Sequence, residues 1–253
     1  MNPPTGKPRT VARLDIKGPN VIKGVQFEGL RIVGEPQSLA ETYYKDGVQE
    51  ILLIDTVASL YGRNHLSSLI RNLVQHIFVP LTVGGGIRSI ADAKEVLAAG
   101  ADKVAVNTEA LQRPELLREL ANEFGSQSVV ISIQATKEAG HWEALSEGGR
   151  ERSGRDVLDW LGEAIDLGAG EALITSVDRD GTGQGFDYPL AAAVDATSTI
   201  PWIMSGGCGN LAHVEELLSV ARPEAISVGR AAHLGKITIG ELLAFLDLRA
   251  VSR

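Results

Sequence analysis

Eight short apolar runs, rich in β-branched residues, recur along the whole chain of 253 residues. They lie at residues 11–16, 50–57, 80–86, 103–108, 128–135, 171–177, 202–207 and 225–230. Between them lie segments such as 114–124 and 211–220, whose apolar residues recur at the three- and four-residue spacing of one helix face. Because the runs are apolar without alternation, we expect strands buried on both faces, as in a parallel sheet.

The number of strand–helix units distinguishes between two parallel architectures. Eight units in about 250 residues is the count of a (β/α)8 TIM barrel. A Rossmann sheet normally needs six strands and a glycine-rich turn after the first, and here "KGPNVIKG" (17–24) follows the first run. No linker rich in Pro, Gly or Ser divides the chain. We therefore predict a single α/β barrel domain over residues 1–253.

The two halves of the chain repeat each other. The segments "TVGGGIRSI" (82–90) and "AGADKVAVNT" (99–108) resemble "IMSGGCGNL" (203–211) and "ARPEAISVGR" (221–230). A repeat of about 120 residues is half a barrel, which predicts two half-barrels at about 9–124 and 125–248 with paired sites on opposite rims.

Composition excludes several classes of function. The net charge of −8 argues against a nucleic-acid or anionic-membrane partner. The single cysteine, Cys208, allows no internal disulfide, and the polar first ten residues do not resemble a signal peptide. We expect a soluble cytoplasmic protein. None of the histidines pairs with another His or Cys at metal-ligand spacing, so we expect no metal: His65, His76, His141, His213 and His233.

Glycine clusters follow two of the strands. Gly84-Gly85-Gly86 is matched in the other half by Ser205-Gly206-Gly207, with Gly229-Arg230 one strand later. Such clusters are either tight turns or loops whose backbone amides hold an anion. Two copies at symmetric barrel positions favour phosphate binding, and hence a ligand with a phosphate at each end. Cys208 fits a small turn residue better than a nucleophile.

Carboxylates also follow the strands. Asp15 ends the first run, Asp55 lies near the end of the second, and Asp178 and Asp180 follow the sixth. At a barrel mouth such groups are catalytic or orient a ligand, although aspartate also caps loops. The connection from Asp15 to Pro36 is long for a βα loop, which predicts either an active-site lid or a disordered excursion. Lys23 within it either attracts a phosphate or solvates the loop.

Several motifs in register carry a family resemblance. They are "RLDIKG…VIKG", "FEGLR", "TVGGGI", "GADKV", "FGSQ", "DRDGT" and "SGG", spread from about residue 9 to about 245. In this order the chain resembles the cyclase subunit of imidazole glycerol phosphate synthase. The resemblance implies a cytoplasmic barrel enzyme without a cofactor that receives ammonia from a glutaminase subunit. The ammonia reacts with a bis-phosphorylated ribulosyl aminoimidazole carboxamide, giving imidazole glycerol phosphate and aminoimidazole carboxamide ribotide in histidine biosynthesis.

The resemblance also implies roles for particular residues. The family's first catalytic aspartate falls on Asp15 and its loop lysine on Lys23. The two phosphate sites fall on Gly86, Asn107 and Thr108, and on Asp180, Gly181, Gly207, Gly229 and Arg230. A ring of charges that gates an ammonia tunnel falls on Arg9, Glu50, Lys103 and Glu171. The surface that meets the glutaminase falls on Asp102 and Gln127.

Two departures leave the function open. Gln134 stands where the family has its second catalytic aspartate, and an amide exchanges no proton near neutral pH. The segment "SLYGRNHL" (59–66) adds Tyr61 and Arg63 at the active rim. The alternatives are the standard cyclase, a paralogue that channels ammonia for amidation of another substrate such as a surface-polysaccharide nucleotide sugar, and a barrel that only binds a glutaminase.

Overall fold

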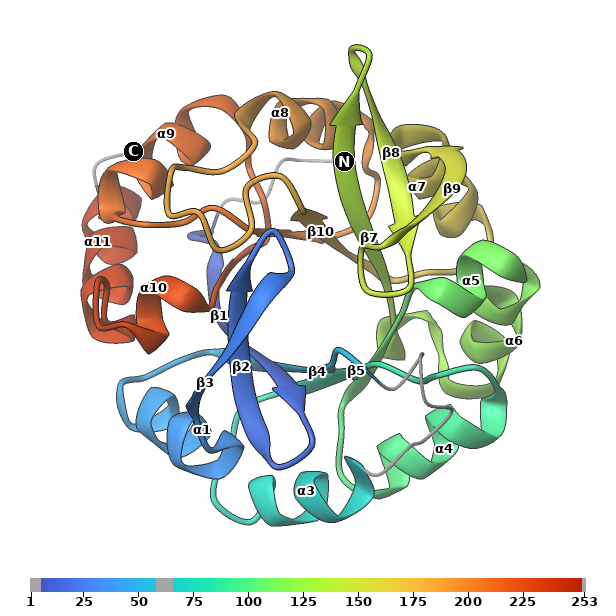
Figure 1. Cartoon of the computed structure of the whole chain (residues 1–253), viewed down its shortest axis with the longest axis horizontal. Coiled ribbons are helices and arrows are strands. Elements are labelled where there is room, and N and C mark those ends of the chain that lie inside the picture. Colours follow the sequence, from blue (N-terminus) through green and yellow to red (C-terminus); the bar gives the residue numbers. More distant parts are fainter. Residues whose placement is uncertain (1–5, 58–65, 252–253) are drawn as a thin grey trace.

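The computed structural model describes residues 6–57 and 66–251, in which eight parallel strands close into a barrel surrounded by helices (Figure 1). Strand pairing runs around the barrel and returns from the last strand to the first. In this order the strands are β1 (Arg9–Lys17), β4 (Glu50–Asp55), β5 (Leu81–Gly84), β6 (Lys103–Val106), β7 (Val129–Glu138), β10 (Glu171–Ser176), β11 (Trp202–Ser205) and β12 (Ala225–Val228). Each matches one predicted run, so the (β/α)8 barrel is confirmed, whereas the half-barrel boundaries stay a prediction.

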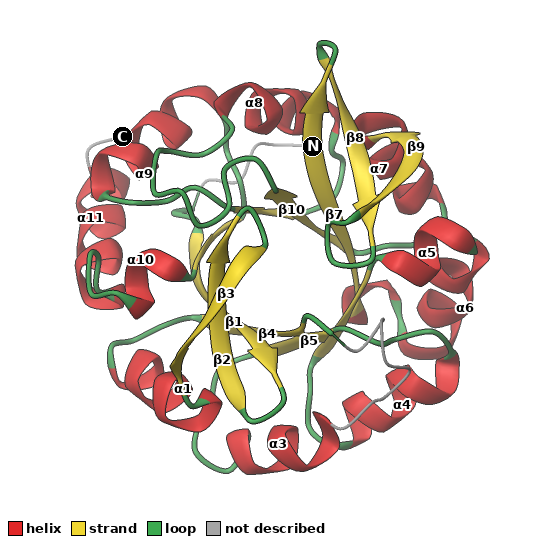
Figure 2. Ribbon diagram, viewed as in Figure 1, coloured by secondary structure: helices red, strands yellow, loops and turns green. Residues whose placement is uncertain are grey.

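Helices cover the outside of the barrel (Figure 2). They are α1 (Pro36–Lys45), α3 (Leu66–Leu73), α4 (Ile90–Ala98), α5 (Thr108–Gln112), α6 (Glu115–Phe124), α7 (Val157–Asp166), α8 (Tyr188–Thr197), α9 (Leu211–Val220), α10 (Arg230–His233) and α11 (Ile239–Val251). The predicted helices 114–124 and 211–220 correspond to α6 and α9. None of the helices in the described part of the chain is long and apolar enough to cross a membrane.

Every second residue of a barrel strand faces the lumen, and these residues form layers. Side chains from seven strands pack into one buried cluster in the middle of the barrel: Val11, Leu52, Ala105, Val130, Leu173, Ile203 and Ala225. We call this cluster the apolar layer. A second, larger cluster packs between the strands and the surrounding helices. The lumen is therefore filled by side chains at mid-height.

The connection after β1 is an ordered antiparallel hairpin of β2 (Asn20–Val25) and β3 (Glu28–Gly34). It lies across the mouth of the barrel in Figure 1. Gln26 and Phe27 form its turn with positive φ angles of 52° and 63°, and the Gln26 amide donates to the Asp180 carbonyl at 2.8 Å. The predicted lid is therefore in the expected place, but it is a docked hairpin rather than a loose loop.

A second extension was not predicted. Strand β7 runs beyond the barrel and pairs with β8 (His141–Ser146), which pairs with β9 (Glu151–Asp156) (Figure 2). The polar stretch "KEAGHWE" (137–143) hides this hairpin, because its strands are short and charged.

The apolar layer yields a stability prediction. Ile203→Ala removes a fully buried side chain and should lower the free energy of unfolding by about 2–5 kcal/mol. The matched control is Ile32→Ala in β3, whose side chain is 66% exposed and should change it by less than about 1 kcal/mol. Urea denaturation followed by circular dichroism measures both. If both variants lower the free energy of unfolding equally, packing in the apolar layer stabilises the fold no more than the exposed Ile32 does.

Candidate active site

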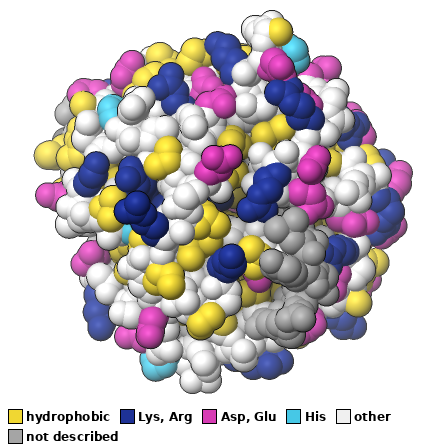
Figure 3. Space-filling view, viewed as in Figure 1, with side chains coloured by type: hydrophobic (Ala, Val, Ile, Leu, Met, Phe, Trp, Pro, Cys, Tyr) yellow, Lys and Arg dark blue, Asp and Glu magenta, His cyan; other side chains and the backbone are white. Residues whose placement is uncertain are grey.

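A large cavity lies at the carboxyl ends of the barrel strands and includes about 1080 Å³ of space, part of it open to solvent. It is lined by five of the eight barrel strands, β1, β4, β5, β6 and β7, by Asp180 in the loop after β10, and by Phe27 and Leu30 of the β2–β3 hairpin. Basic and acidic side chains are mixed around the mouth on this face (Figure 3). Because (β/α)8 barrels place their chemistry at this end, the cavity is the candidate active site.

Four buried charged side chains, which we call the ion cluster, lie at the floor of the cavity: Arg13, Asp15, Lys23 and Asp180. Asp15 accepts hydrogen bonds from Arg13 Nε at 2.7 Å and from Lys23 Nζ at 2.6 Å. Lys23 also lies 2.8 Å from Asp180 Oδ2. The cluster joins β1, the hairpin and the loop after β10, which brings the predicted residues Asp15, Lys23 and Asp180 together.

The ion cluster fixes the protonation state of Asp15. Burial alone would raise the pKa of this carboxyl, but the charges of Arg13 and Lys23 outweigh burial and hold the pKa well below its usual value. Burial likewise works to lower the pKa of Lys23, and Asp15 and Asp180 reverse the shift and raise it. At neutral pH Asp15 is therefore a carboxylate that accepts hydrogen bonds, and Lys23 is an ammonium that donates them.

Gln134 lies opposite Asp15, because β7 is four strands away from β1 in either direction around the barrel. Its side chain lines the cavity, and its buried Oε1 accepts no hydrogen bond from the described part of the chain. A buried acceptor of this kind lacks a donor that a bound ligand can provide. Gln134 can therefore orient a ligand, but it leaves Asp15 as the only carboxylate of the expected pair.

The first predicted phosphate site is assembled on one side of the cavity. Gly84, Gly85 and Gly86 end β5, and Asn107 and Thr108 lie where β6 passes into α5. A Cβ on Gly85 would lie 2.2 Å from the Asp55 carbonyl oxygen, so this position requires glycine. The Asn107 side chain donates to the Leu145 carbonyl at 3.0 Å, which links this loop to the second hairpin.

The second predicted phosphate site lines a smaller, adjoining cavity. Gly181, Gly206, Gly207, Gly229 and Arg230 surround it together with hydroxyls of β11 and β12. The Arg230 side chain donates to the Gly181 carbonyl at 2.6 Å, which holds the two loops together. Arg13, Lys23 and Asp180 line both cavities, so the ion cluster separates the two loop sites.

Two other candidates have structural partners. Burial raises the pKa of Cys208 to about 12, so its thiol stays protonated, as expected of a turn residue and not of a nucleophile. Asp178 accepts hydrogen bonds from the Thr136 hydroxyl at 2.9 Å and the Lys137 amide at 2.7 Å. It ties the loop after β10 to the β7 extension. Asp55 accepts a hydrogen bond from the Val57 amide at 3.0 Å and lines the large cavity.

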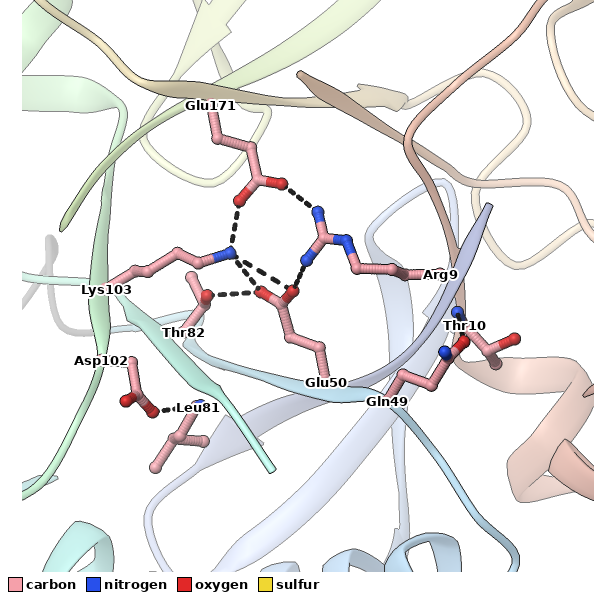
Figure 4. Close-up of polar contacts among 9 residues, drawn as sticks. All are labelled: Arg9, Thr10, Gln49, Glu50, Leu81, Thr82, Asp102, Lys103 and Glu171. Carbon is pink, nitrogen blue, oxygen red and sulfur yellow. Dashed lines mark hydrogen bonds and ion pairs between the residues drawn. The ribbon is translucent and has the colours of Figure 1, made fainter. Parts of the chain in front are cut away.

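The predicted charged ring closes the opposite end of the barrel (Figure 4). Arg9 pairs with Glu50 and Glu171, and Lys103 pairs with the same two carboxylates at 3.1 and 2.6 Å. The Thr82 hydroxyl donates to Glu50 at 2.7 Å. Burial works to lower the pKa of Arg9, but Glu171 and Glu50 outweigh it and raise the pKa. The four residues thus form a closed ring of alternating charge below the apolar layer.

The two predicted interface residues lie at the same end as the charged ring. Asp102 immediately precedes β6 and accepts a hydrogen bond from the Leu81 amide at 2.8 Å (Figure 4). Gln127 lies in a 3-10 turn (Ser126–Ser128) just before β7 and is exposed. Tyr61 and Arg63 lie outside the described residues. Arg13 was not among the predicted residues, although its position two residues before Asp15 places both on the lumen side of β1.

The fold and this cavity define a (β/α)8 barrel whose candidate active site has two glycine-rich loop clusters around a buried ion cluster. A sequence profile described as "Histidine biosynthesis protein" matches residues 9–238, and the chain belongs to this family. It is 52% identical to the Legionella pneumophila "Imidazole glycerol phosphate synthase subunit HisF" over 204 residues, 80% of this chain and 96% of the relative. The proteins of the same name from Streptococcus sanguinis and Thermococcus gammatolerans are each 44% identical, over 93% and 96% of this chain and 94% and 96% of their own.

His233, beside the second loop cluster, gives a pH prediction. Its Nδ1 lies 2.6 Å from the Tyr43 hydroxyl, and burial, followed by the charge of Lys23, lowers its pKa from 6.5 to about 4. The unfolded chain therefore binds the proton more readily, so His233 stabilises the fold above pH 6.5 and loses this effect as the pH falls toward 4. The loss should reach up to about 3 kcal/mol.

Urea titrations at several pH values between 4 and 6.5 measure this effect. His233→Phe should flatten the pH dependence in this window, whereas His141→Gln, at the exposed first residue of β8, should leave it unchanged. If the free energy of unfolding of His233→Phe changes with pH as steeply as that of the wild type, His233 has the same pKa in the folded and unfolded states.

Proposed function

We propose that this chain is the cyclase subunit of imidazole glycerol phosphate synthase. It takes ammonia from a glutaminase subunit and combines it with the bis-phosphorylated ribulosyl aminoimidazole carboxamide. The products are imidazole glycerol phosphate and aminoimidazole carboxamide ribotide. The observation that carries the proposal is the pairing of two loop clusters around Asp15 at one end of the barrel with a closed charged ring at the other end.

The cavity suits a substrate with a phosphate at each end. The two loop clusters approach the ion cluster from different strands, with Gly86, Asn107 and Thr108 on one side and Gly207, Gly229 and Arg230 on the other. Glycine-rich backbone at a strand end leaves amides free to hold phosphate oxygens. Because the chain carries a net charge of −8, local amides and arginines must bind the phosphates against the overall field.

The acid–base chemistry rests on Asp15 and Lys23. Asp15 is an ionised acceptor, and the Lys23 ammonium, 2.6 Å away, is the adjacent proton donor. Gln134 orients the reacting groups through its Oε1, which has no donor among the described residues. The docked hairpin places its Phe27 ring over the Arg13 guanidinium at 5.8 Å, which limits the access of water to this buried side chain.

A second function is favoured by one observation, the amide at position 134. In this alternative the barrel passes ammonia to a different acceptor, such as a nucleotide sugar that is amidated for a surface polysaccharide. The charged ring and the ion cluster would serve this role as well, since neither depends on the second catalytic aspartate.

Asp15→Asn tests the cyclase function. Replacing the carboxylate should lower turnover of the bis-phosphorylated substrate, supplied with ammonium chloride, by about 10²–10⁴-fold. Product formation is followed by chromatography. Asp247→Asn in α11, whose side chain is 61% exposed, is the matched control and should leave the rate unchanged. If the wild type shows no turnover while Gln134→Asp gains it, the ammonia-channelling alternative is supported instead.

Arg9→Ala tests the charged ring as a gate for ammonia. Removing the guanidinium opens the ring, so glutamine-driven turnover with the glutaminase should fall at least about tenfold, while ammonium-driven turnover stays within about twofold. Lys7→Ala at the same end, where Lys7 pairs only with exposed Asp247 among the described residues, is the control. A parallel loss of both activities would mean that the ring supports the barrel and does not gate it.

A further inference from the structure

Arg13 occupies the lumen of the barrel between the apolar layer and Asp15. On β1, Arg9 belongs to the charged ring and Val11 to the apolar layer, and Arg13 follows two residues later on the same side. This places it one layer higher, roughly 6–7 Å further along the strand. A small molecule that moves from the ring to the cavity along the lumen has to pass this layer.

The surroundings of Arg13 hold its side chain in place within the lumen. Nη1 donates to the Thr175 hydroxyl at 2.9 Å and to the Ser205 hydroxyl at 3.2 Å, from β10 and β11. Nε donates to Asp15 at 2.7 Å. The side chain is only 4% exposed, and the Phe27 ring lies above it. Arg13 is therefore a fixed cation inside the barrel and not a surface charge.

A fixed guanidinium distinguishes ammonia from ammonium on two grounds. It has only donors, so it can bind the lone pair of ammonia but offers nothing to ammonium, which has no lone pair. It also balances the ion cluster, in which two cations, Arg13 and Lys23, face two carboxylates, Asp15 and Asp180. His233 is the further titratable neighbour and is neutral near pH 7, because its pKa is about 4. Without Arg13 the cluster would have an excess negative charge that attracts a cation.

We propose that Arg13 is a specificity-determining residue that admits neutral ammonia to the cavity and keeps ammonium out. The proposal rests on the ammonia route of the proposed function, but not on which acceptor the ammonia reaches. It assigns Arg13 a role separate from the charged ring, which closes the far end of the lumen. Selection of neutral ammonia matters because only the neutral form has the lone pair that forms the new C–N bond.

Rubidium, a cation of similar size to ammonium, provides a binding test that needs no substrate. Crystals of the full chain are soaked in rubidium chloride, and the ion is located by anomalous scattering. No rubidium is expected beside Asp15 in the wild type, whereas Arg13→Gln, which keeps donors for Thr175 and Ser205 but loses the charge, should bind it there. Arg13→Lys keeps the charge and should exclude it. Rubidium in the wild type, or none in Arg13→Gln, would overturn the proposal.

Kinetics provides a second test in solution. The concentration of free ammonia is held constant while that of ammonium is raised by lowering the pH. The wild-type rate should then stay constant, because it depends on free ammonia alone. In Arg13→Gln the apparent KM for ammonia should rise about tenfold, corresponding to about one pKa unit of charge interaction. Arg118→Gln in α6, whose arginine side chain is 53% exposed, is the control. If the rates of the wild type and of Arg13→Gln depend equally on the ammonium concentration, the proposal is contradicted. If the wild type shows no turnover, the cyclase function is refuted, and the rubidium experiment decides the role of Arg13.

Discussion

The structure depends on one constraint, which is that a closed barrel of parallel strands turns every second side chain into a narrow lumen. Four consecutive lumen positions of β1 are occupied by Arg9, Val11, Arg13 and Asp15. They place a charged ring, an apolar layer, a buried cation and a carboxylate in that order along the barrel. No loop is needed to establish this order, because alternate residues of one strand face the same side. The loops at the carboxyl ends add the glycine clusters, the β2–β3 hairpin with Lys23, and Asp180 after β10.

Burying four charges at the floor of the cavity is costly unless each has a partner. Lys23 bridges Asp15 and Asp180, and Arg13 pairs with Asp15 and with two hydroxyls, so the cluster satisfies most of its groups internally. The same contacts anchor the hairpin, since Lys23 belongs to β2 and reaches across to the loop after β10. The closed position of the hairpin and the ionised state of Asp15 are therefore consequences of one network.

Much of the fold could be predicted because its signals are local. Eight apolar runs and the repeat of their glycine-rich ends identify the barrel strands. Because these strands are parallel, their carboxyl ends, with Asp15 and Gln134, lie at the same mouth of the barrel. Strands β8 and β9 could not be predicted, because polar and charged residues interrupt their apolar pattern and the strands form by pairing with β7 and with each other. Arg13 was missed for a different reason: an arginine within an apolar run is ordinarily assigned to the surface, and only closure of the barrel shows that it is buried.

Gln134 and Arg13 have related consequences. The amide removes one carboxyl group of the expected pair, and the charges of Arg13 and Lys23 keep the other, Asp15, ionised near neutral pH. Proton transfer in this cavity therefore starts from an ionised Asp15 that accepts a hydrogen bond from a protonated Lys23. Ammonia that enters unprotonated becomes a cationic nitrogen when the C–N bond forms, and the carboxylates of Asp15 and Asp180 beside Lys23 can stabilise this positive charge until the nitrogen loses a proton. Asp15 is held ionised, and its expected partner is an amide. The reaction in this site therefore depends more strongly on whether the nitrogen arrives as ammonia or as ammonium than it would in a site with two carboxyl groups that exchange protons.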